Sequence, residues 1–489
     1  MTDPLHLGRH DSWDGVRAVV AGFGVSGFAA TDNLLHLGAK VSALDEQPAD
    51  ASTERAEKAE LLEVLGADIR LGAGATATLP DDVDLLVTSP GWRPDAPLLA
   101  QARARGIPVW GEVELAWRLR DPNHDTPWLC VTGTNGKTTT VQMLDSILRA
   151  AGLRSVAVGN VGLPIVEAVM DPEPYDVFAV ELSSFQLHYT DSMAAQAAAV
   201  LNVAEDHLDW YAGPSAMHDY AADKGRIYER VERACIYNVA DPETERLVRE
   251  ADVQDGARAI GFTLGMPLVG MLGVVEDILA DRAFIEQRDS SAAELCTLSD
   301  LASQAPHNVA NALAAAALAR AHGVSQAAVR DGLRAFRPDG HRIAVVGERD
   351  GITWVDDSKA TNPHAAQSSL QAYESVVWVA GGLAKGARFE DLVLAVRDRL
   401  RGVVLLGRDR EVIAEALARH APDVPVTTVE GGETRGEHGS MERVVEAAAA
   451  LARPGDTVLL APGCASMDMF TNYAERGDAF AAAVHRRID

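Results

Sequence analysis

The stretch "WLCVTGTNGKTTTVQML", residues 128–144, decides the fold class of the chain. An apolar run typical of a buried strand ends in a turn at Gly133 and Gly136, and Lys137 then opens a helical pattern. Backbone N–H groups of such a turn face phosphates, the lysine neutralises their charge, and a threonine hydroxyl can ligate Mg²⁺. The spacing GxxGKT is shorter than that of the common phosphate loop, and the alternative is a plain turn with an exposed lysine. We predict an ATP-binding loop built from Gly133, Thr134, Asn135, Gly136, Lys137, Thr138 and Thr139.

A second glycine turn, "VVAGFGVSGF" at residues 19–28, precedes the first. Gly22, Gly24 and Gly27 spell GxGxxG between a strand pattern and a helix pattern, and Asp45 ends the next strand pattern. This arrangement is typical of a pyrophosphate cradle, which could serve NAD, FAD or a nucleotide sugar, although a tight strand–helix turn explains it too. Because a redox cofactor has no obvious role beside an ATP loop, we expect a non-redox ligand.

The chain organisation indicates three α/β domains. Its 489 residues exceed one ordinary core, and strand-like runs that end in glycine alternate with helical patterns throughout. Two polar segments with proline, "RDPNHDTP" at 120–127 and "LRAFRPDGHR" at 333–342, indicate boundaries. We predict domains at 1–121, 122–338 and 339–489, each with a mainly parallel sheet. The segment "EGGETRGEHGSME", 430–442, is predicted to be a loop.

The composition narrows the class of protein. A formal net charge of −27 argues against sequence-independent nucleic-acid binding. If the ligands are phosphates, cations inside the glycine motifs must make the electrostatic potential positive at the binding sites. No apolar run is long enough to span a bilayer, and the N-terminus lacks the pattern of a signal peptide. The four cysteines form no CxxC pair. We expect a cytoplasmic protein with reduced thiols and no nucleic-acid partner.

Seven motifs together carry a family resemblance. In chain order they are "TGTNGKTTT", "GNVG", "ELSSFQL", "NVAEDHLDWY", "HNVANALAA", "DDSKATNP" and "PGCASMDMF". They resemble the Mur ligases of peptidoglycan synthesis over essentially the whole chain, and the last two motifs resemble the D-glutamate-adding branch. The resemblance implies a Rossmann-like UDP-binding domain, a central P-loop-type ATPase domain and a Rossmann-like C-terminal domain. It also implies a monomer that uses ATP to join D-glutamate to UDP-N-acetylmuramoyl-L-alanine (UDP-MurNAc-L-Ala) through an acyl phosphate and a tetrahedral intermediate.

The resemblance also implies where the UDP substrate and the metal ions bind. Glu181 ends an apolar strand pattern beside the phosphate loop, which by itself favours a Mg²⁺ ligand over a surface acid. His207 and Lys224 would otherwise be interpreted as a structural histidine and a solvated helix lysine. The family match makes His207 a metal and substrate group and Lys224 a carbamylated ligand of a second Mg²⁺. The catalytic set is then Lys137, Glu181, His207 and Lys224, and the metal set is Thr138, Glu181, His207 and Lys224. The implied UDP-substrate residues are Gly24, Val25, Ser26, Gly27, Asp45, Ser89, Pro90, Gly91, Asn160 and His207.

Two further groups of residues follow from the resemblance. The remaining ATP contacts are Asn308, Asn311, Arg342, Asp357 and Lys359. The D-glutamate contacts are Thr361, Lys385, Ser466 and Tyr473. Tyr473 stands where many members carry phenylalanine, and its hydroxyl is expected to be tolerated near a polar substrate. Trp92 and Trp210 also replace commoner residues, which affects the expected fine contacts to the substrate and not the expected reaction.

Other interpretations remain open at this point. Another Mur ligase or a folylpolyglutamate synthetase would share the ATP loop, but "DDSKATNP" together with "CASMDMF" is not expected there. An inert nucleotide sensor is disfavoured because Lys137, Glu181, His207 and Lys224 are all present. An NAD-dependent dehydrogenase is disfavoured by the short phosphate loop.

Overall fold

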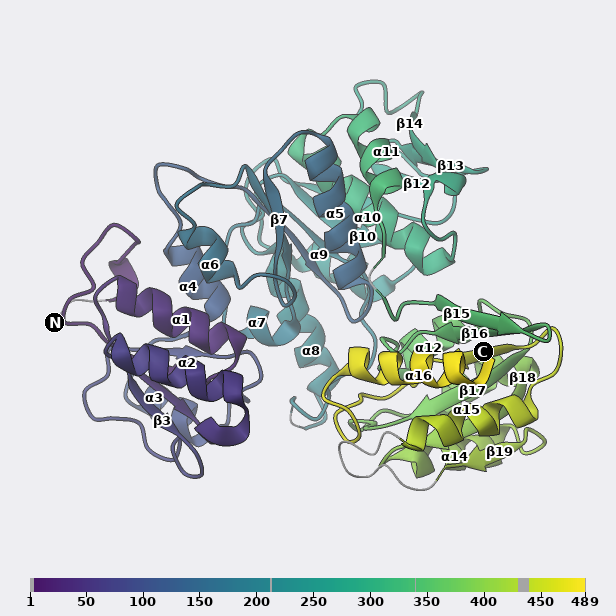
Figure 1. The fold of residues 1–489 in the computed structure, drawn as a ribbon. Coiled ribbons are helices and arrows are strands. Elements are labelled where there is room, and N and C mark those ends of the chain that lie inside the picture. Colours follow the sequence, from purple (N-terminus) through teal and green to yellow (C-terminus); the bar gives the residue numbers. More distant parts are fainter. Residues whose placement is uncertain (1–3, 212, 339, 430–438, 489) are drawn as a thin grey trace. The chain divides into compact units, whose positions relative to one another are not determined.

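A computed structural model describes residues 4–211, 213–338, 340–429 and 439–488. The chain forms two compact units, Met1–Val203 with His218–Phe336, and Ala204–Met217 with Arg337–Asp489. The first unit contains two sheets and the second contains one. Strands alternate with helices as predicted, which confirms the α/β class (Figure 1). Most of the predicted loop at 430–442 lies outside the described residues.

The N-terminal sheet of the first unit has five parallel strands in the order β3-β2-β1-β4-β5. The strand order reverses between β1 and β4, and ligands of open α/β sheets bind at the carboxyl ends of strands at such a point. The strands are β1 Arg17–Ala21, β2 Lys40–Asp45, β3 Asp68–Leu71, β4 Leu85–Thr88 and β5 Val109–Gly111. The helices are α1 Val25–His36, α2 Thr53–Val64, α3 Pro97–Ala104 and α4 Glu112–Arg118, with short 3₁₀ turns at Pro4–His6 and Ala49–Ala51.

The second sheet of this unit has nine strands in the order β14-β13-β12-β11-β10-β9-β6-β8-β7. It is parallel from β7 to β12, and β12, β13 and β14 form an antiparallel edge. The strands are β6 Trp128–Thr132, β7 Ser155–Gly159, β8 Val177–Glu181, β9 Ala197–Val200, β10 Ala234–Asn238, β11 Arg258–Phe262, β12 Met271–Val275, β13 Ile278–Asp281 and β14 Ala293–Thr297. The helices are α5 Lys137–Ala150, α6 Ile165–Met170, α7 Ser184–His188, α8 Ala216–Gly225, α9 Pro242–Glu250, α10 Pro306–His322 and α11 Gln326–Ala335, with 3₁₀ turns at Arg226–Tyr228 and Leu298–Asp300.

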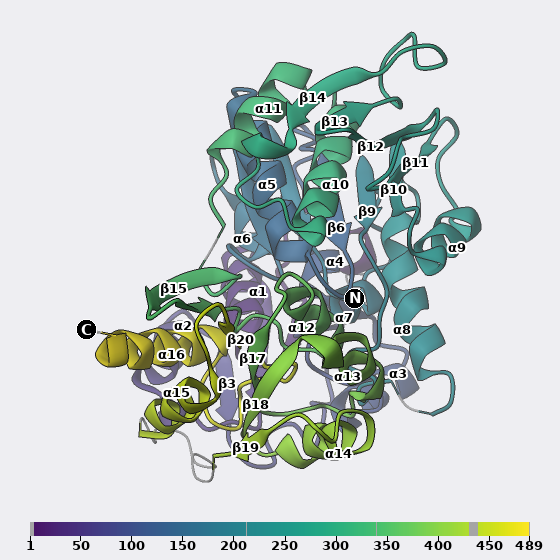
Figure 2. The same cartoon turned by 90° about the vertical axis from the view of Figure 1, so that its right-hand side faces the viewer.

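Helices α5, α10 and α11 pack together on the nine-stranded sheet (Figure 2). The alanine-rich run of α10 is fully buried, because small side chains let this helix approach the sheet closely. Helix α11 approaches α5 through Gly332, where an added Cβ would lie 2.3 Å from the Ile147 Cα. These contacts hold α5, and with it the phosphate loop, against a rigid layer.

The two sheets of the first unit share one hydrophobic cluster. Trp128 of β6 makes an edge contact with Trp117 of α4, with ring centroids 5.0 Å apart, and a second one with Phe178 of β8 at 6.2 Å. All three side chains are buried. Aromatic packing across this junction explains why the N-terminal and central sheets form one compact unit.

The second unit has a six-stranded sheet in the order β15-β16-β20-β17-β18-β19, parallel except for the β15–β16 pair. The strands are β15 Ala344–Arg349, β16 Ile352–Asp356, β17 Val376–Gly381, β18 Leu400–Leu406, β19 Val426–Thr428 and β20 Thr457–Leu460. The helices are α12 Pro363–Leu370, α13 Glu390–Val396, α14 Arg410–His420, α15 Gly439–Leu451 and α16 Tyr473–Ile488, with a 3₁₀ turn at Arg397–Arg399. The segment Ala204–Met217 joins this unit, in which Arg388 pairs with Glu205 at 3.3 Å.

Candidate active site

The phosphate loop connects the buried strand β6 to α5. Gly133 has φ 155°, and Gly136, the N-cap of α5, has φ 85°, a left-handed conformation that favours glycine. A Cβ on Gly136 would lie 2.4 Å from the Asn311 Oδ1. The turn therefore requires glycine both for its backbone and for the close approach of α10. Its N–H groups and the N-terminus of α5 form an anion-binding end.

Two lysines converge on one carbonyl of this loop. Lys137 Nζ donates to the Gly133 and Thr134 carbonyls at 2.9 and 3.0 Å, and Lys224 Nζ donates to the Gly133 carbonyl at 3.0 Å. Lys224 is only 2% exposed and lies 4.4 Å from the centroid of the Tyr220 ring. The Tyr220 hydroxyl in turn lies 3.0 Å from the Thr134 Oγ1. A chain of net charge −27 thus places two ammonium groups where phosphates are predicted to bind.

Glu181 lies at the carboxyl end of β8, beside Val131 of β6. It is 1% exposed, and its Oε1 accepts a hydrogen bond from the Asn160 side chain at 2.9 Å. Its Oε2 is buried and has no hydrogen-bond partner among the described residues. Thr138 is the second residue of α5, which follows the neighbouring strand β6, and is also buried. An orphaned carboxylate oxygen on the strand beside β6 and a threonine hydroxyl at the start of α5 are ligand types that fit a hard divalent cation such as Mg²⁺.

The predicted substrate loop is attached to the same carboxylate. Gly159 pairs with Glu181 across the sheet, and a Cβ on Gly159 would lie 2.2 Å from the Glu181 carbonyl oxygen. The Asn160 N–H donates to that oxygen at 2.9 Å. The structure therefore brings the predicted substrate residue Asn160 to the predicted metal ligand Glu181.

Asn202 supports the phosphate loop, although it was not among the predicted residues. Its Oδ1 accepts from the Asn135 N–H at 2.9 Å, and its Nδ2 donates to the Asn135 carbonyl at 3.1 Å. Asn202 begins the motif "NVAEDHLDWY", so its signal was present in the sequence. On the predicted adenine side, Asn311 reaches the loop, and Asn308 lies one turn earlier on α10.

A pocket of about 620 Å³ opens at the strand reversal of the five-stranded sheet. Its lining residues are Gly22, Gly24, Asp45, Ser89, Gly91, Trp92, Arg93, Asp95, Ala96 and Pro97. Gly22 has φ 101°, and a Cβ there would lie 2.6 Å from the Ser89 Oγ. The turns after β1 and β4 therefore meet closely and form one wall. A site with glycine turns and an arginine at a strand reversal suits a phosphorylated ligand.

The predicted UDP-substrate residues contribute to the turns around this pocket in different ways. Asp45 holds the turn itself, because its carboxylate accepts from the Phe23 and Gln47 N–H groups at 2.7 and 2.8 Å. Arg55, which was not predicted, pairs with Asp45 at 3.3 Å. The other predicted residues occupy the same two turns: Val25 (64% exposed), Ser26 and Gly27 at the start of α1, and Pro90 in the turn after β4. Trp92 and Arg93 line the pocket in addition.

In the second unit, most of the predicted residues lie in loops after β16, β17 and β20, whereas Arg342 precedes β15 and Tyr473 begins α16. Leu383 and Ala465 exchange two backbone hydrogen bonds of 2.9 Å, which joins the loop of Lys385 to the loop of Ser466. Ser466 is buried, and Lys385 has φ 49°. Thr361 follows β16, which neighbours β20. Because these strands are parallel, Thr361, Lys385 and Ser466 share one edge of the sheet.

Asp357 and Lys359 hold the loop after β16. Burial raises the pKa of Asp357 to about 6, although a hydrogen bond from Ser369 and the charge of Arg342 oppose this. Lys359 Nζ donates to the Tyr473 hydroxyl at 3.0 Å. The hydroxyl group that distinguishes Tyr473 from the commoner phenylalanine therefore has a hydrogen-bond partner in this chain, Lys359.

A buried arginine, missed by the sequence analysis, ties these loops together. Arg476 of α16 is 1% exposed and donates to the Ser358 hydroxyl at 2.9 Å, the Ser358 carbonyl at 2.7 Å and the Cys464 carbonyl at 3.0 Å. Burial lowers the pKa of Arg476 to about 10. Its position one turn into a helix offered no distinguishing pattern.

His207 belongs to the segment that clusters with the second unit. It has φ 53°, and its Nε2 lies 3.7 Å from the Asp206 carboxylate. Its predicted role with Thr138, Glu181 and Lys224 stays a prediction.

The sequence matches three family models in chain order. These are the Mur ligase MurD-like N-terminal domain over residues 16–111, the Mur ligase middle domain over 131–319, and the Mur ligase glutamate ligase domain over 341–464. The three matches divide the chain as the three-domain α/β fold requires.

Individual proteins resemble the chain over its whole length. It is 60% identical to UDP-N-acetylmuramoylalanine--D-glutamate ligase of Streptomyces avermitilis, covering 97% of this chain and 98% of that one. It is 46% identical to the protein of the same name from Mycolicibacterium smegmatis, covering 97% of each. Among solved structures, UDP-N-acetylmuramate-alanine ligase MurC of Thermotoga maritima has a TM-score of 0.55 at 18% identity, covering 96% of this chain and 99% of that one. A pseudomurein peptide ligase type C of Methanothermus fervidus has a TM-score of 0.58 at 15% identity, covering 97% and 100%. These last two show the shared fold.

Proposed function

The chain belongs to the Mur ligase family, and from this premise we propose that it joins D-glutamate to UDP-MurNAc-L-Ala at the expense of ATP. The products are UDP-MurNAc-L-Ala-D-Glu, ADP and phosphate, which makes the chain an enzyme of peptidoglycan precursor synthesis. The observation that carries this proposal is that Lys137 and Lys224 both reach the Gly133 carbonyl of the phosphate loop, while Glu181, at the end of the strand beside β6, keeps a buried oxygen without a partner among the described residues. Lys137 then supplies the cation that phosphoryl transfer needs, and Glu181 and Lys224 are available as metal ligands.

The first step is transfer of the γ-phosphoryl group. A carboxylate oxygen of UDP-MurNAc-L-Ala attacks the γ-phosphorus, and the bond from this phosphorus to the oxygen of the β-phosphate breaks. The products of this step are ADP and the acyl phosphate of the substrate. Lys137 and the N–H groups of the loop hold the phosphates and neutralise charge during the transfer. Asn160, held by Glu181, orients the acyl end of the substrate. The catalytic work here is positioning and charge stabilisation.

The second step forms the amide. The neutral amine of D-glutamate attacks the acyl carbon, which becomes tetrahedral, and the carbon–oxygen bond to phosphate then breaks. The amine nitrogen loses one proton to solvent or to a base and keeps the other as the amide N–H, and inorganic phosphate leaves. In the second unit, Lys385 receives a carboxylate of D-glutamate, and Thr361, Ser466 and Tyr473 complete that site. Their common sheet edge and the Leu383–Ala465 pairing support this assignment.

Two Mg²⁺ ions complete the proposed site. Thr138 and Glu181 would hold the first, and a carbamylated Lys224 together with His207 would hold the second. When bound, the ions neutralise charge on the ATP phosphates and on the acyl phosphate. The burial of Thr138, Glu181 and Lys224 supports their part in this set, and the part of His207 follows from the family resemblance alone.

The remaining assignments are also proposals. Asn308, Asn311, Arg342, Asp357 and Lys359 complete the ATP site, and the turns after β1 and β4 bind the UDP part. The domains are 1–121, 122–338 and 339–489, and the protein acts as a cytoplasmic monomer. Four buried free cysteines agree with a reducing compartment. In the described ranges, no helix combines the length and the apolar character that crossing a membrane requires.

The test is ADP release by the purified protein with ATP, Mg²⁺ and UDP-MurNAc-L-Ala. We expect release to require D-glutamate and the product mass to rise by one glutamyl residue. L-glutamate, L-alanine and meso-diaminopimelate serve as matched alternative amines. Faster turnover with any of these would replace the proposed substrate.

A further inference from the structure

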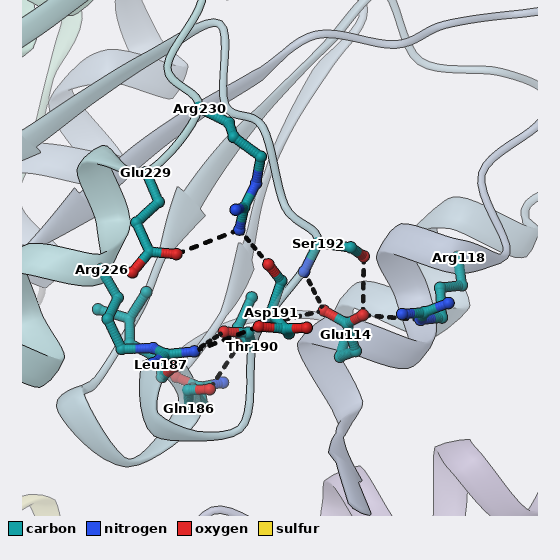
Figure 3. Close-up of polar contacts among 10 residues, drawn as sticks. All are labelled: Glu114, Arg118, Gln186, Leu187, Thr190, Asp191, Ser192, Arg226, Glu229 and Arg230. Atoms are coloured by element: carbon teal, nitrogen blue, oxygen red, sulfur yellow. Dashed lines mark hydrogen bonds and ion pairs between the residues drawn. The ribbon is translucent and has the colours of Figure 1, made fainter. Parts of the chain in front are cut away.

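Two glutamates of α4 are both buried but have opposite surroundings. Glu112 is 2% exposed and Glu114 is 0% exposed. Glu114 accepts four hydrogen bonds: from the Asp191 and Ser192 N–H groups at 2.8 and 2.9 Å, and from the Ser192 hydroxyl and Arg118 at 2.7 Å each (Figure 3). Burial raises its pKa, but these four donors outweigh burial and hold the pKa below the ordinary value. Glu114 is therefore ionised throughout the neutral range.

Glu112 lacks such compensation. Its Oε1 accepts from the Val166 N–H at 3.0 Å, and its Oε2 is buried without a hydrogen-bond partner among the described residues. Burial raises the pKa of Glu112 to about 7, opposed by the Val166 and Ile165 N–H groups and helped by the charge of Glu167. The Ser26 hydroxyl is near enough to lower this pKa slightly, although no hydrogen bond of ordinary geometry joins it to Oε2.

The position of Glu112 links it to two predicted substrate elements. Helix α4 packs against α1 and α6. Ser26 lies at the start of α1, in the turn proposed to hold the UDP diphosphate. Helix α6 follows the loop that carries Asn160. The Glu112 carboxyl therefore lies close to the start of α1, behind the turn that is proposed to hold the diphosphate.

Several charged side chains lie on α4 and on the helices packed against it, and none of them takes the place of Glu112 as the group that binds the proton. The elements packed against α4 contribute Asp32 and His36 from α1, Glu167 from α6 and His188 from α7, and α4 itself contributes Glu114 and Arg118. Of these, Glu167 acts on Glu112, and Glu167 is itself influenced by Asp32 and by Lys58 of α2. His188 is engaged with Asp223 at 2.9 Å. The surroundings of Glu112 are thus net acidic, which favours its neutral form.

We propose that Glu112 takes up a proton when UDP-MurNAc-L-Ala binds, and that its O–H then donates to Ser26, which leaves the Ser26 hydroxyl free to donate to the diphosphate. The inference rests on the proposed function. An ionised Glu112 would repel the diphosphate and would attract the Ser26 hydroxyl proton away from it. The proton comes from the buffer and is attached to Oε2, the oxygen without a partner. Glu112 is a positioning residue, because it acts on the ligand through Ser26.

The sign of the pH effect follows from this linkage. Below pH 7 Glu112 already carries its proton in the free protein, so affinity is flat. Above pH 7 each binding event must take up a proton, and affinity falls by up to roughly tenfold per pH unit. Glu112→Gln keeps an acceptor for the Val166 N–H and adds a permanent donor for Ser26. The variant should therefore bind at pH 8.5 about as tightly as the wild type binds at pH 6.5.

The experiment is titration calorimetry with UDP-MurNAc-L-Ala, without ATP, in phosphate and in Tris at pH 6.5, 7.5 and 8.5. The difference in heat between the two buffers gives the protons taken up. We expect about one proton per ligand at pH 8.5 in the wild type, none in Glu112→Gln, and retained uptake in the matched control Glu167→Gln. Absence of uptake in the wild type at pH 8.5 would overturn the inference without any variant, and so would unchanged uptake in Glu112→Gln. Absence of binding at every pH would instead overturn the proposed function.

Discussion

Replacing Glu114 by alanine should destabilise the junction between α4 and the turn at Asp191 and Ser192. The substitution leaves two backbone N–H groups and the Ser192 hydroxyl without their acceptor, and it removes the carboxylate partner of Arg118, which keeps its hydrogen bond to the Leu5 carbonyl (Figure 3). Removing one member of a buried charged pair costs about 3–5 kcal/mol. Because the Arg118 side chain keeps 20% exposure and can reach water, we expect the lower end, about 3 kcal/mol. Ser192→Ala, which removes one charge-assisted hydrogen bond, should cost about 1.5 kcal/mol.

The assay is amide hydrogen exchange at Asp191 and Ser192, with urea unfolding followed by tryptophan fluorescence as a second measurement. A loss of about 3 kcal/mol corresponds to roughly 100-fold faster exchange at these amides. Glu63→Ala on the exposed face of α2 is the control and should change stability by less than about 0.5 kcal/mol. The pKa of Glu114 is lowered from its usual value of 4.5, so its contribution is fully present above pH 4.5 and is lost as the pH falls further. The reasoning is refuted if Glu114→Ala unfolds within about 1 kcal/mol of the wild type at pH 7 with unchanged exchange at Asp191 and Ser192.

Three further predictions concern the proposed site. Lys137→Ala should reduce ADP formation by about 10³-fold, because it removes a cation from the phosphates. Unfolding by urea should be unchanged. Near-normal turnover of this variant would show that Lys137 does not act on the phosphates of ATP. Lys224→Ala should be almost inactive and partly restored by a small added carboxylate that occupies the vacated ligand position; normal turnover of the folded variant at low CO₂ would rule out the carbamate. Lys385→Met should raise the KM for D-glutamate roughly 10- to 150-fold, the equivalent of one charge-assisted hydrogen bond, with a smaller effect on ATP. If ATP binding is lost and the D-glutamate KM is kept, Lys385 belongs to the nucleotide site.

The local motifs were predictable because their requirements are local. Gly133 and Gly136 need backbone conformations and close approaches that other residues do not tolerate, and the apolar run before them predicts β6 directly. The same holds for Gly22 and the turn after β1. Alternation of such runs with helical patterns predicted the α/β class, and the structure confirmed it. The antiparallel edge formed by β12, β13 and β14 was not foreseen, since short strands of this kind lack a distinctive pattern.

By itself, the sequence determined the strand–turn–helix units, the order of the three α/β regions, and the identity of the glycines and cations at the turns. Only the tertiary structure decided which distant groups meet those turns. Lys224 reaches the carbonyl of Gly133, 91 positions earlier in the chain, and Asn202 reaches Asn135 across 67 positions. Glu112 and Glu114 have the same chemistry and lie two residues apart, yet Glu114 accepts hydrogen bonds at both carboxylate oxygens and Glu112 accepts at Oε1 with Oε2 left without a partner among the described residues. Proton affinity depends on burial and on neighbouring donors, which are properties of the packed molecule and not of the side chain alone.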